Sequence, residues 1–128
     1  MLIDTSNSVA HSSLYAPAVQ GVTDFLNESL TGPQDKAFFV SFSALPYGTR
    51  FLTRAEVTSL KLNFSTGGGT ALYDALQRAC LERMKSDPAP PARRVLLVLS
   101  DGDDNLSHVD RNAAIAAAQG AGAVVFAF

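Results

Sequence analysis

The 128-residue sequence has a single cysteine, almost no net charge and no long apolar run. The lone Cys80 excludes an internal disulfide, and its helix-like surroundings favour a buried, inert thiol over a nucleophile. A formal net charge of −2 gives no basic surface for nucleic acid and no polybasic patch for a membrane. The most apolar stretch, residues 113–128, is too short and too alanine-rich for a membrane span. Met1 is followed almost at once by Asp4, without the apolar core of a signal peptide.

The sequence does contain enough apolar material for a folded domain. Hydrophobic residues make up 47% of the chain and charged residues 17%, a balance typical of globular proteins rather than disordered ones. A chain of this length can bury roughly two-thirds of the surface that it exposes when unfolded. Residues 1–128 are therefore expected to form one domain or part of one.

Short strands and helices alternate along the first half of the chain. Apolar residues at helical spacing predict one long helix, and an aromatic, β-branched run predicts a buried strand. The expected elements are a strand end at Met1–Ile3, a helix from Ser12 or Ser13 to Leu30, a strand at Phe38–Phe42, a turn at Pro46–Gly48, a partner strand at Arg50–Thr53 and a short helix at Glu56–Leu62. The two strands on either side of the turn are expected to form a hairpin.

The second half continues the alternation. A run that is apolar on both faces is typical of a central parallel strand, and a proline-rich run is typical of a stiff connector. The expected elements are a loop at Gly67–Thr70, a helix with its apolar face from Leu72 to Cys80, a connector at Asp87–Pro91, a central strand at Val95–Leu99, a polar loop at Ser100–Asn105, a helix at Asp110–Gln119 and a strand at Ala123–Phe128.

This order of elements predicts an α/β fold. We expect a Rossmann-like three-layer sandwich with a mostly parallel central sheet, helices on both faces and an antiparallel edge hairpin. Ligands of such sheets bind at the carboxyl ends of the strands. The polar clusters Asp4–Ser8 and Ser100–Asn105 each follow a predicted strand directly, so they are expected to share one edge.

The first of these clusters has the chemistry of a site for a hard cation. In Asp4-Thr5-Ser6-Asn7-Ser8, one carboxylate and two hydroxyls occupy alternate positions, which point the same way in an extended segment. Oxygen ligands of this kind suit a divalent cation such as Mg²⁺, whereas zinc prefers Cys and His. Asp and Ser are also ordinary turn and helix-cap residues, so the rest of the chain decides between the two interpretations.

Three separated motifs together resemble the von Willebrand factor A domain. They are Asp4-x-Ser6-x-Ser8, the run from Gly68 to Ala75 (Gly-Gly-Thr-Ala-Leu-Tyr-Asp-Ala) and the run from Leu97 to Gly102 (Leu-Val-Leu-Ser-Asp-Gly). Their order and spacing match the metal-ion-dependent adhesion site of that family. The residues within the motifs are similar to those of the bacterial branch of the family, in particular of the group described from acidobacteria.

The resemblance implies a set of metal ligands and a mode of binding. Residue by residue, the implied ligands are Asp4, Ser6, Ser8, Thr70 and Asp101. The hydroxyls would bind Mg²⁺ (or Mn²⁺ or Ca²⁺) directly, with Asp4 acting through water. A partner protein would present an Asp or Glu carboxylate to the ion, and the domain would not be an enzyme. Family members are often exported, so a secreted or cell-envelope location is suspected.

Other residues near the motifs are assigned more modest roles. Asp74 is expected to lie behind the ligands or to act as an acid in the first turn of a helix. Asp103 and Asp104 are expected to form a solvated acidic loop, and His11 and His108 are expected to be exposed loop residues. The glycines at 67–69 are not followed by the Gly-Lys-Ser/Thr of a phosphate-binding loop, so close approach of the backbone to the metal loop explains them better.

Two alternatives stand beside the binding module. A Mg²⁺-dependent phosphohydrolase of the haloacid dehalogenase type also carries Asp residues after two strands, but it needs a carboxylate two positions after the first Asp. That position is Ser6, and Lys61 and Lys85 lie in unsuitable stretches for a catalytic lysine. The other alternative is a fragment without function, because the family's domain has a longer first strand and a further helix, strand and helix. The chain is thus expected to be a partial domain, truncated at both ends.

Overall fold

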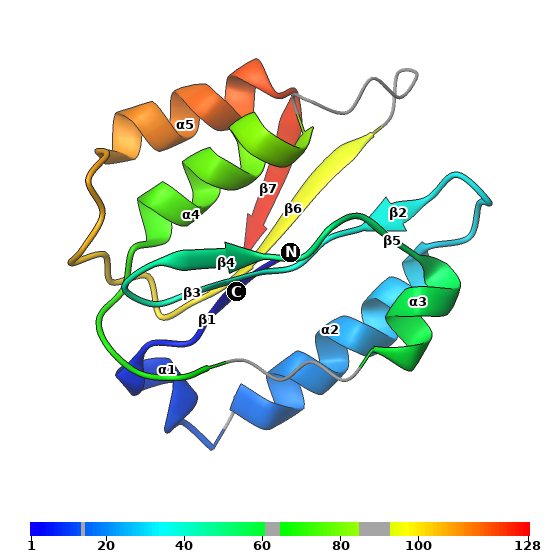
Figure 1. Ribbon diagram of the computed structural model, residues 1–128, viewed down its shortest axis with the longest axis horizontal. Helices are drawn as coiled ribbons and strands as arrows, with labels where there is room; N and C mark the ends of the chain where they lie inside the picture. The colour runs from blue at the N-terminus through cyan, green and yellow to red at the C-terminus, as the bar shows by residue number, and fades with distance from the viewer. Residues whose placement is uncertain (14, 61–64, 85–92) are drawn as a thin grey trace.

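The computed structural model describes residues 1–13, 15–60, 65–84 and 93–128, and it is a three-layer α/β sandwich (Figure 1). The helical elements are α1 (Asn7–Ala10), α2 (Tyr15–Ser29), α3 (Arg54–Ser59), α4 (Leu72–Arg78), the π-helical turn η1 (Ala79–Met84) and α5 (Arg111–Gly120). The strands are β1 (Leu2–Asp4), β2 (Lys36–Ala37), β3 (Val40–Phe42), β4 (Pro46–Gly48), β5 (Leu52–Thr53), β6 (Arg94–Leu99) and β7 (Ala123–Ala127).

The main sheet has five strands in the order β4-β3-β1-β6-β7. Strand β1 is parallel to β3 and to β6, β7 is parallel to β6, and only β4 is antiparallel, at the edge. Leu2 and Ile3 of the central strand are completely buried, one on each face of the sheet. The predicted fold class is therefore confirmed.

Helices cover both faces of the sheet, as Figure 1 shows. Helices α4 and α5 lie on one face, where the core includes Leu2, Phe42, Ala75, Cys80, Leu96 and Ala117. Helices α2 and α3 lie on the other, where the core includes Ile3, Phe39, Leu52, Val57 and Leu97. The small side chains of α5 let it lie close to the sheet and to α4.

Cys80 is fully buried in η1, as its sequence context predicts. Burial raises the pKa of the Cys80 thiol to about 11, because the charged thiolate is disfavoured away from water. The thiol is therefore protonated at neutral pH and is a poor nucleophile.

The hairpin differs from the expectation. The partner of β3 is β4, at Pro46–Gly48, which was expected to be the turn; Phe42 pairs with Pro46, so the turn is residues 43–45. Pro46 is tolerated because it begins an edge strand, where a missing N–H costs no ladder bond. The predicted partner strand at Arg50–Thr53 instead supplies β5, which pairs with β2 in a separate two-stranded sheet.

Smaller differences concern the ends of the helices. The first long helix begins at Tyr15 rather than at Ser12 or Ser13, and the short helix α1 precedes it. Helix α3 begins at Arg54, where Thr53 and Glu56 form a reciprocal capping box. The connector at 87–91, the end of the predicted helix at 61–62 and the lysines at 61 and 85 lie outside the described residues. No helix within the described ranges is long and apolar enough to cross a membrane.

Candidate metal centre

Two of the polar clusters lie side by side at the carboxyl edge of the sheet, as the sequence predicts. Asp4 is the last residue of β1, and Ser100 and Asp101 come directly after β6. The parallel register that pairs Ile3 with Leu99 brings Asp4 level with Ser100. The third cluster, Gly67–Thr70, is the loop before α4, and it is bonded to the first.

Hydrogen bonds join the motif at Asp4–Ser8 and the motif at Ser100–Asp101 into one group of oxygen atoms. Oδ1 of Asp4 accepts a bond of 2.8 Å from the backbone N–H of Ser6, and Oδ2 accepts one of 2.6 Å from the Ser100 hydroxyl. The hydroxyls of Ser6 and Ser8 are 3.2 Å apart, and the Ser8 hydroxyl donates to Oδ2 of Asp101 at 2.7 Å. We call Asp4, Ser6, Ser8, Ser100 and Asp101 the oxygen cluster.

Thr70 lies in the loop between the other two motifs. Its backbone N–H donates to Oδ1 of Asn105 at 2.8 Å, and its carbonyl accepts from the N–H groups of Asn105 and Leu106, both at 3.0 Å. The backbone of Asn7 donates to the Gly68 carbonyl on the other side. Within the described residues, no hydrogen bond joins the Thr70 hydroxyl to the oxygen cluster. The structure thus places the loop of Thr70 against both motifs.

The glycines of this loop are explained by a close approach and by backbone conformation. A Cβ atom at Gly69 would lie 2.5 Å from Oδ1 of Asn105 and 2.8 Å from Cδ1 of Leu106. Gly67 and Gly68 have φ angles of 125° and 80°, which favour glycine. The tight contact at Gly69 is with the loop after β6, whereas the sequence pointed to the first metal loop.

The negative charge of the oxygen cluster has no protein cation beside it in the described part of the chain. Asp4 is completely buried, and the ion pairs of the described residues all lie elsewhere: Arg50–Glu56, Arg78–Glu82 and His108–Asp74. A buried carboxylate is costly unless hydrogen bonds and an opposite charge compensate it. Hydrogen bonds are present on both oxygens of Asp4, and a cation bound at the cluster would supply the opposite charge.

The Tyr15 hydroxyl also lacks a partner. It is shielded from solvent, and it makes no hydrogen bond to any residue that the structure describes. Burial raises the pKa of Tyr15, and the negative charge of Asp4 raises it further, so the phenol is close enough to the carboxylate to feel its charge. An unpartnered buried hydroxyl that feels the charge of a buried carboxylate suits a place where an ordered water or ion would bind.

These residues fit a hard divalent cation. The donor set is two carboxylates and neutral hydroxyls, which suits Mg²⁺ or Mn²⁺ with several retained waters. Among the described residues there is no group of three or more His, Cys, Asp and Glu side chains that could hold a metal, so hydroxyl oxygens would have to complete the ligand set.

The loop after β6 is held to α4 by acidic side chains with structural roles. Oδ1 of Asp74 accepts from the backbone N–H groups of His108 and Val109, and Oδ2 lies 2.9 Å from Nδ1 of His108. Burial raises the pKa of Asp74, but the hydrogen bonds from His108 and Val109 outweigh it, so the net pKa is lowered. Asp74 therefore anchors this loop at the start of α4.

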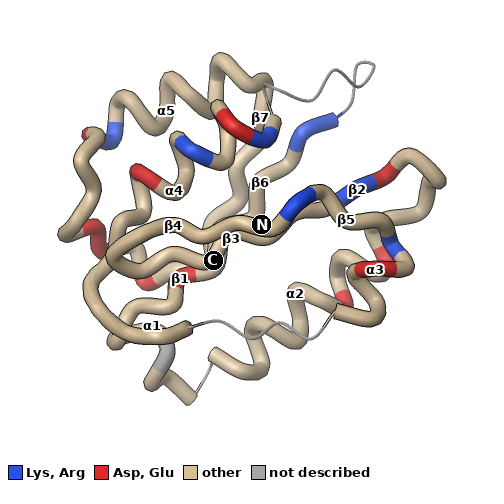
Figure 2. The backbone as a smooth tube through the Cα atoms, in the orientation of Figure 1, with Lys and Arg blue, Asp and Glu red and all other residues tan. Residues whose placement is uncertain are grey.

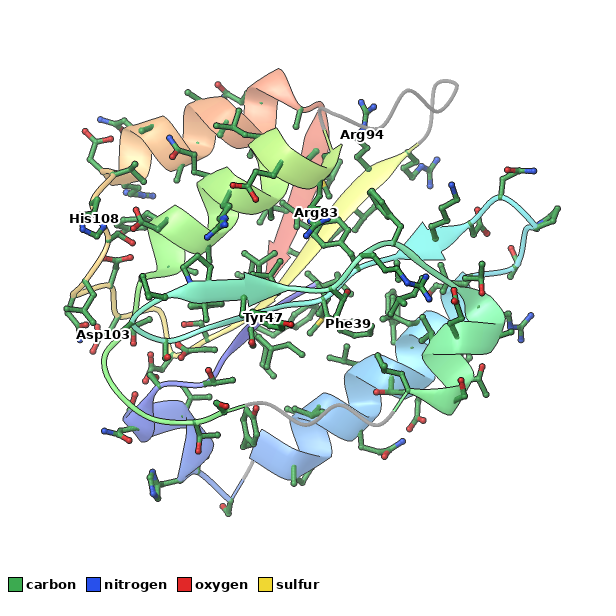
Figure 3. The ribbon with its side chains drawn as sticks, in the orientation of Figure 1. Phe39, Tyr47, Arg83, Arg94, Asp103 and His108 are labelled. Carbon is green, nitrogen blue, oxygen red and sulfur yellow. The ribbon has the colours of Figure 1, made fainter. Side chains whose placement is uncertain are left out.

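Asp104 differs from the expectation of a solvated acid. It accepts from the backbone N–H of Tyr73 at 2.9 Å and from the Ser107 hydroxyl at 2.6 Å, so it satisfies a free donor in the first turn of α4. Asp103 and His108 are exposed as expected, on the loop that leads from β6 to α5 (Figure 3). His11 is also exposed, with Nδ1 at 2.8 Å from the Asn7 carbonyl.

Sequence reasoning missed Ser100, Asn105 and Tyr15 as members of the site. Ser100 stands directly before Asp101 and continues β6 beside the end of β1. Its position in the sequence could therefore have indicated that it lies close to Asp4. Asn105 and Tyr15 have no local signal, because their roles depend on how the loops and α2 pack.

Solved structures resemble this fold over almost its whole length. The proximal thread matrix protein 1 of the mussel byssus superposes with a TM-score of 0.72 at 22% identity, over 98% of this chain and 34% of that protein. A von Willebrand factor type A protein from Catenulispora acidiphila gives 0.68 at 22% identity, over 98% and 31%. An aerotolerance-related membrane protein from Bacteroides fragilis gives 0.65 at 19% identity, over 98% and 63%.

The chain spans about a third of the length of the first two of these structures. No protein-family model matches the sequence, and no curated protein matches it. At identities of 22% or less the similarity concerns the fold alone. The arrangement of strands and helices is nevertheless shared throughout, and the chain has the fold of the von Willebrand factor type A domain.

Proposed function

We propose that this domain is a protein-binding module of the adhesion type, in which a divalent cation at the oxygen cluster captures a carboxylate of a partner protein. The observation that supports it most is the chain of hydrogen bonds that links Asp4, Ser6, Ser8 and Asp101 at one edge of the sheet. The fold similarity to a von Willebrand factor type A protein and to a thread matrix protein is in keeping with an interaction module.

The residues of the proposed site would have different roles toward the ion. Ser6, Ser8 and Thr70 would supply neutral oxygens, while Asp4 would compensate the ion from within the protein. Asp101 is exposed, so the ion that it helps to hold would face solvent and a partner. With few charged ligands the bound ion, Mg²⁺ or a similar cation, would remain a Lewis acid toward an external carboxylate.

The phosphohydrolase alternative gains no support from the site. The position where it needs a general acid holds Ser6, whose backbone N–H is bonded to Asp4 and whose side chain is buried. A nucleophilic Asp4 would also need solvent access, and it has none. The domain is therefore proposed as a binding module and not as an enzyme.

Capture of a carboxylate can be tested with a small probe. Mn²⁺ bound to the protein enhances the relaxation of water protons, and a ligand that displaces its water lowers that enhancement. Acetate is expected to lower the enhancement, whereas acetamide, the uncharged isostere, is not; free Mn²⁺ titrated in the same way corrects for direct binding. An equal response to acetate and acetamide would contradict the proposal. The same titration on Asp103→Asn, which removes an exposed carboxylate from the same loop, should match the wild type.

A further inference from the structure

A polar cavity lies between the edge strand β4 and the helical elements α4 and η1. It has a volume of about 190 Å³, and the residues that line it include Pro46, Gly48, Arg78, Glu82 and Arg83. Strands β4 and β7 form opposite edges of the main sheet, so the cavity lies at the other edge from the last strand of the chain. No residue of the oxygen cluster lines it. The cavity is therefore a separate candidate site.

The cavity carries a positive charge that no carboxylate of the described residues compensates. Arg78 is paired with Glu82 at 2.8 Å, whereas Arg83, which is half-buried, has no ion pair with any residue that the structure describes. The strands on the other side of the cavity cannot supply one. Residues 37–49 contain no Asp or Glu, and Figure 2 shows β3 and β4 without a coloured segment. A half-buried guanidinium group without a carboxylate partner suits the binding of an anion.

One backbone N–H of β4 faces out of the sheet beside this cavity. Val40 donates to the Met1 carbonyl at 2.8 Å, so its backbone groups point to β1 and away from β4. Gly48 lies opposite Val40, and the two residues of such an antiparallel pair exchange no hydrogen bonds. Gly48 therefore directs its N–H outward, whereas Pro46, two positions earlier, has no N–H. A single outward N–H is too little for an added strand, but it suits one oxygen of an anion.

Gly48 and Arg83 lie close together because Gly48 has no side chain. A Cβ atom there would lie 3.8 Å from Nη2 of Arg83 and 3.4 Å from Cγ2 of Val40. Figure 3 shows the Arg83 side chain on the side of η1 that faces β4. Gly48 is not one of the glycines with a positive φ angle, so its backbone conformation does not require glycine. Its missing Cβ leaves open space between the strand and the guanidinium group.

We propose that this cavity binds a carboxylate group, which is held by the guanidinium group of Arg83 and by the N–H of Gly48. A guanidinium group presents two parallel N–H donors that match the two oxygens of a carboxylate. The backbone N–H adds a donor from the strand. A carboxylate suits the site better than a phosphate dianion, because only one positive charge is uncompensated and Glu82 would repel a second negative charge. The inference does not rest on the proposed function, since it needs no metal ion.

An NMR titration of the metal-free, isotope-labelled protein with sodium propionate at constant ionic strength tests the proposal. The amide signal of Gly48 is expected to shift and to saturate, whereas propionamide, the uncharged isostere, is expected to have no effect. Arg83→Gln should lower the affinity by about tenfold or more, because hydrogen bonds from a charged donor are lost. Arg83→Lys keeps the charge without the two parallel donors, so its affinity should be intermediate. Arg111→Gln removes the same charge from the start of α5, and it should bind propionate as the wild type does.

A second probe distinguishes two sources of the carboxylate. N-acetyl-glutamate N-methylamide carries its carboxylate on a side chain between two peptide bonds. If it binds more tightly than propionate, the site takes an acidic side chain of a partner protein; if it binds equally or more weakly, the site takes a small free acid.

Three results would overturn the proposal. They are a shift of the Gly48 amide that does not saturate with propionate, an equal response to propionamide, and an equal affinity in Arg83→Gln and the wild type. Because the protein is free of metal in this titration, these results do not depend on whether the oxygen cluster binds an ion.

Discussion

The Ser8 hydroxyl donates a hydrogen bond of 2.7 Å to Oδ2 of Asp101, which stands 93 positions later in the sequence. The bond crosses from the short helix α1, which follows β1, to the loop after β6, and Ser100 makes a second link by donating to Asp4 at 2.6 Å. Two motifs that are remote in the chain therefore form one cluster at the sheet edge. The predictions for the metal site follow from this arrangement.

The Thr70 hydroxyl is predicted to be a metal ligand. Thr70→Val keeps the shape of this buried side chain and removes the oxygen, so it should lower the affinity for Mg²⁺ measured by calorimetry. Thr70→Ser keeps the hydroxyl and should retain most of the affinity. The loss in Thr70→Val should be smaller than in Asp101→Asn, because a neutral ligand contributes less than a carboxylate. Equal affinity in Thr70→Val and the wild type would remove Thr70 from the ligand set.

The close approach at Gly69 should make a methyl group costly. In Gly69→Ala the new Cβ would meet Asn105 at 2.5 Å, and the displaced loop should lower the free energy of unfolding by about 1–3 kcal/mol. Gly120→Ala is the matched control, because a Cβ there meets nothing within 4 Å and alanine favours the helix; it should stabilise by about 0.5–1 kcal/mol. Urea unfolding measures both, and similar changes in the two variants would contradict the role of Gly69.

The unpartnered Tyr15 hydroxyl is predicted to support the bound ion through water. Tyr15→Phe removes only this oxygen, so stability should change little or rise, since a buried unsatisfied group is lost. Affinity for Mg²⁺ should nevertheless fall by about tenfold, as for other groups that lie behind metal ligands. Calorimetry and thermal unfolding on the same variant separate the two effects. An unchanged affinity would show that the hydroxyl is only a packing defect.

Glu56 is expected to make the free energy of unfolding depend on pH in the acid range. Hydrogen bonds from Arg50 and from the backbone and hydroxyl of Thr53 lower the pKa of Glu56 from 4.5 to about 2. Because the folded pKa lies below the unfolded one, this contribution to stability is present above about pH 4.5 and is lost as the pH falls toward 2. Unfolding free energies measured over that range should fall less steeply in Glu56→Gln. Glu28→Gln, on the exposed surface of α2, controls for the loss of a charge, and the same slope in Glu56→Gln and the wild type would contradict the account.

The general fold was predictable from the sequence because its signals are local. The run Val95–Leu99 is apolar on both faces, and β6 is indeed the parallel neighbour of β1, with Leu96, Leu97 and Val98 buried. The apolar spacing that predicted a helix up to Leu30 corresponds to α2, although the helix begins two to three residues later than expected. The gathering of Asp4 and Asp101 at one edge followed from the rule that parallel strands end together.

The errors occurred where pairing or packing over long distances decides the structure. Pro46–Gly48 has the composition of a turn, yet it forms β4 because the edge of β3 is available to it. Asp104 looks like a surface acid, and only the position of α4 turns it into a cap for the N–H of Tyr73. The lack of a described partner for the Tyr15 hydroxyl likewise depends on how the folded chain packs, so no sequence pattern predicts it.

The central claim is that the oxygen cluster binds a divalent cation, and calorimetric titration with Mg²⁺ tests it most directly. The wild type is expected to bind one ion, Asp101→Asn is expected to abolish the binding, and Asp103→Asn, which removes the same charge from the same loop, is expected to bind as the wild type does. Circular dichroism should show the same secondary structure in all three proteins. Equal Mg²⁺ binding by the wild type and Asp101→Asn, or no binding by the wild type, would contradict the claim.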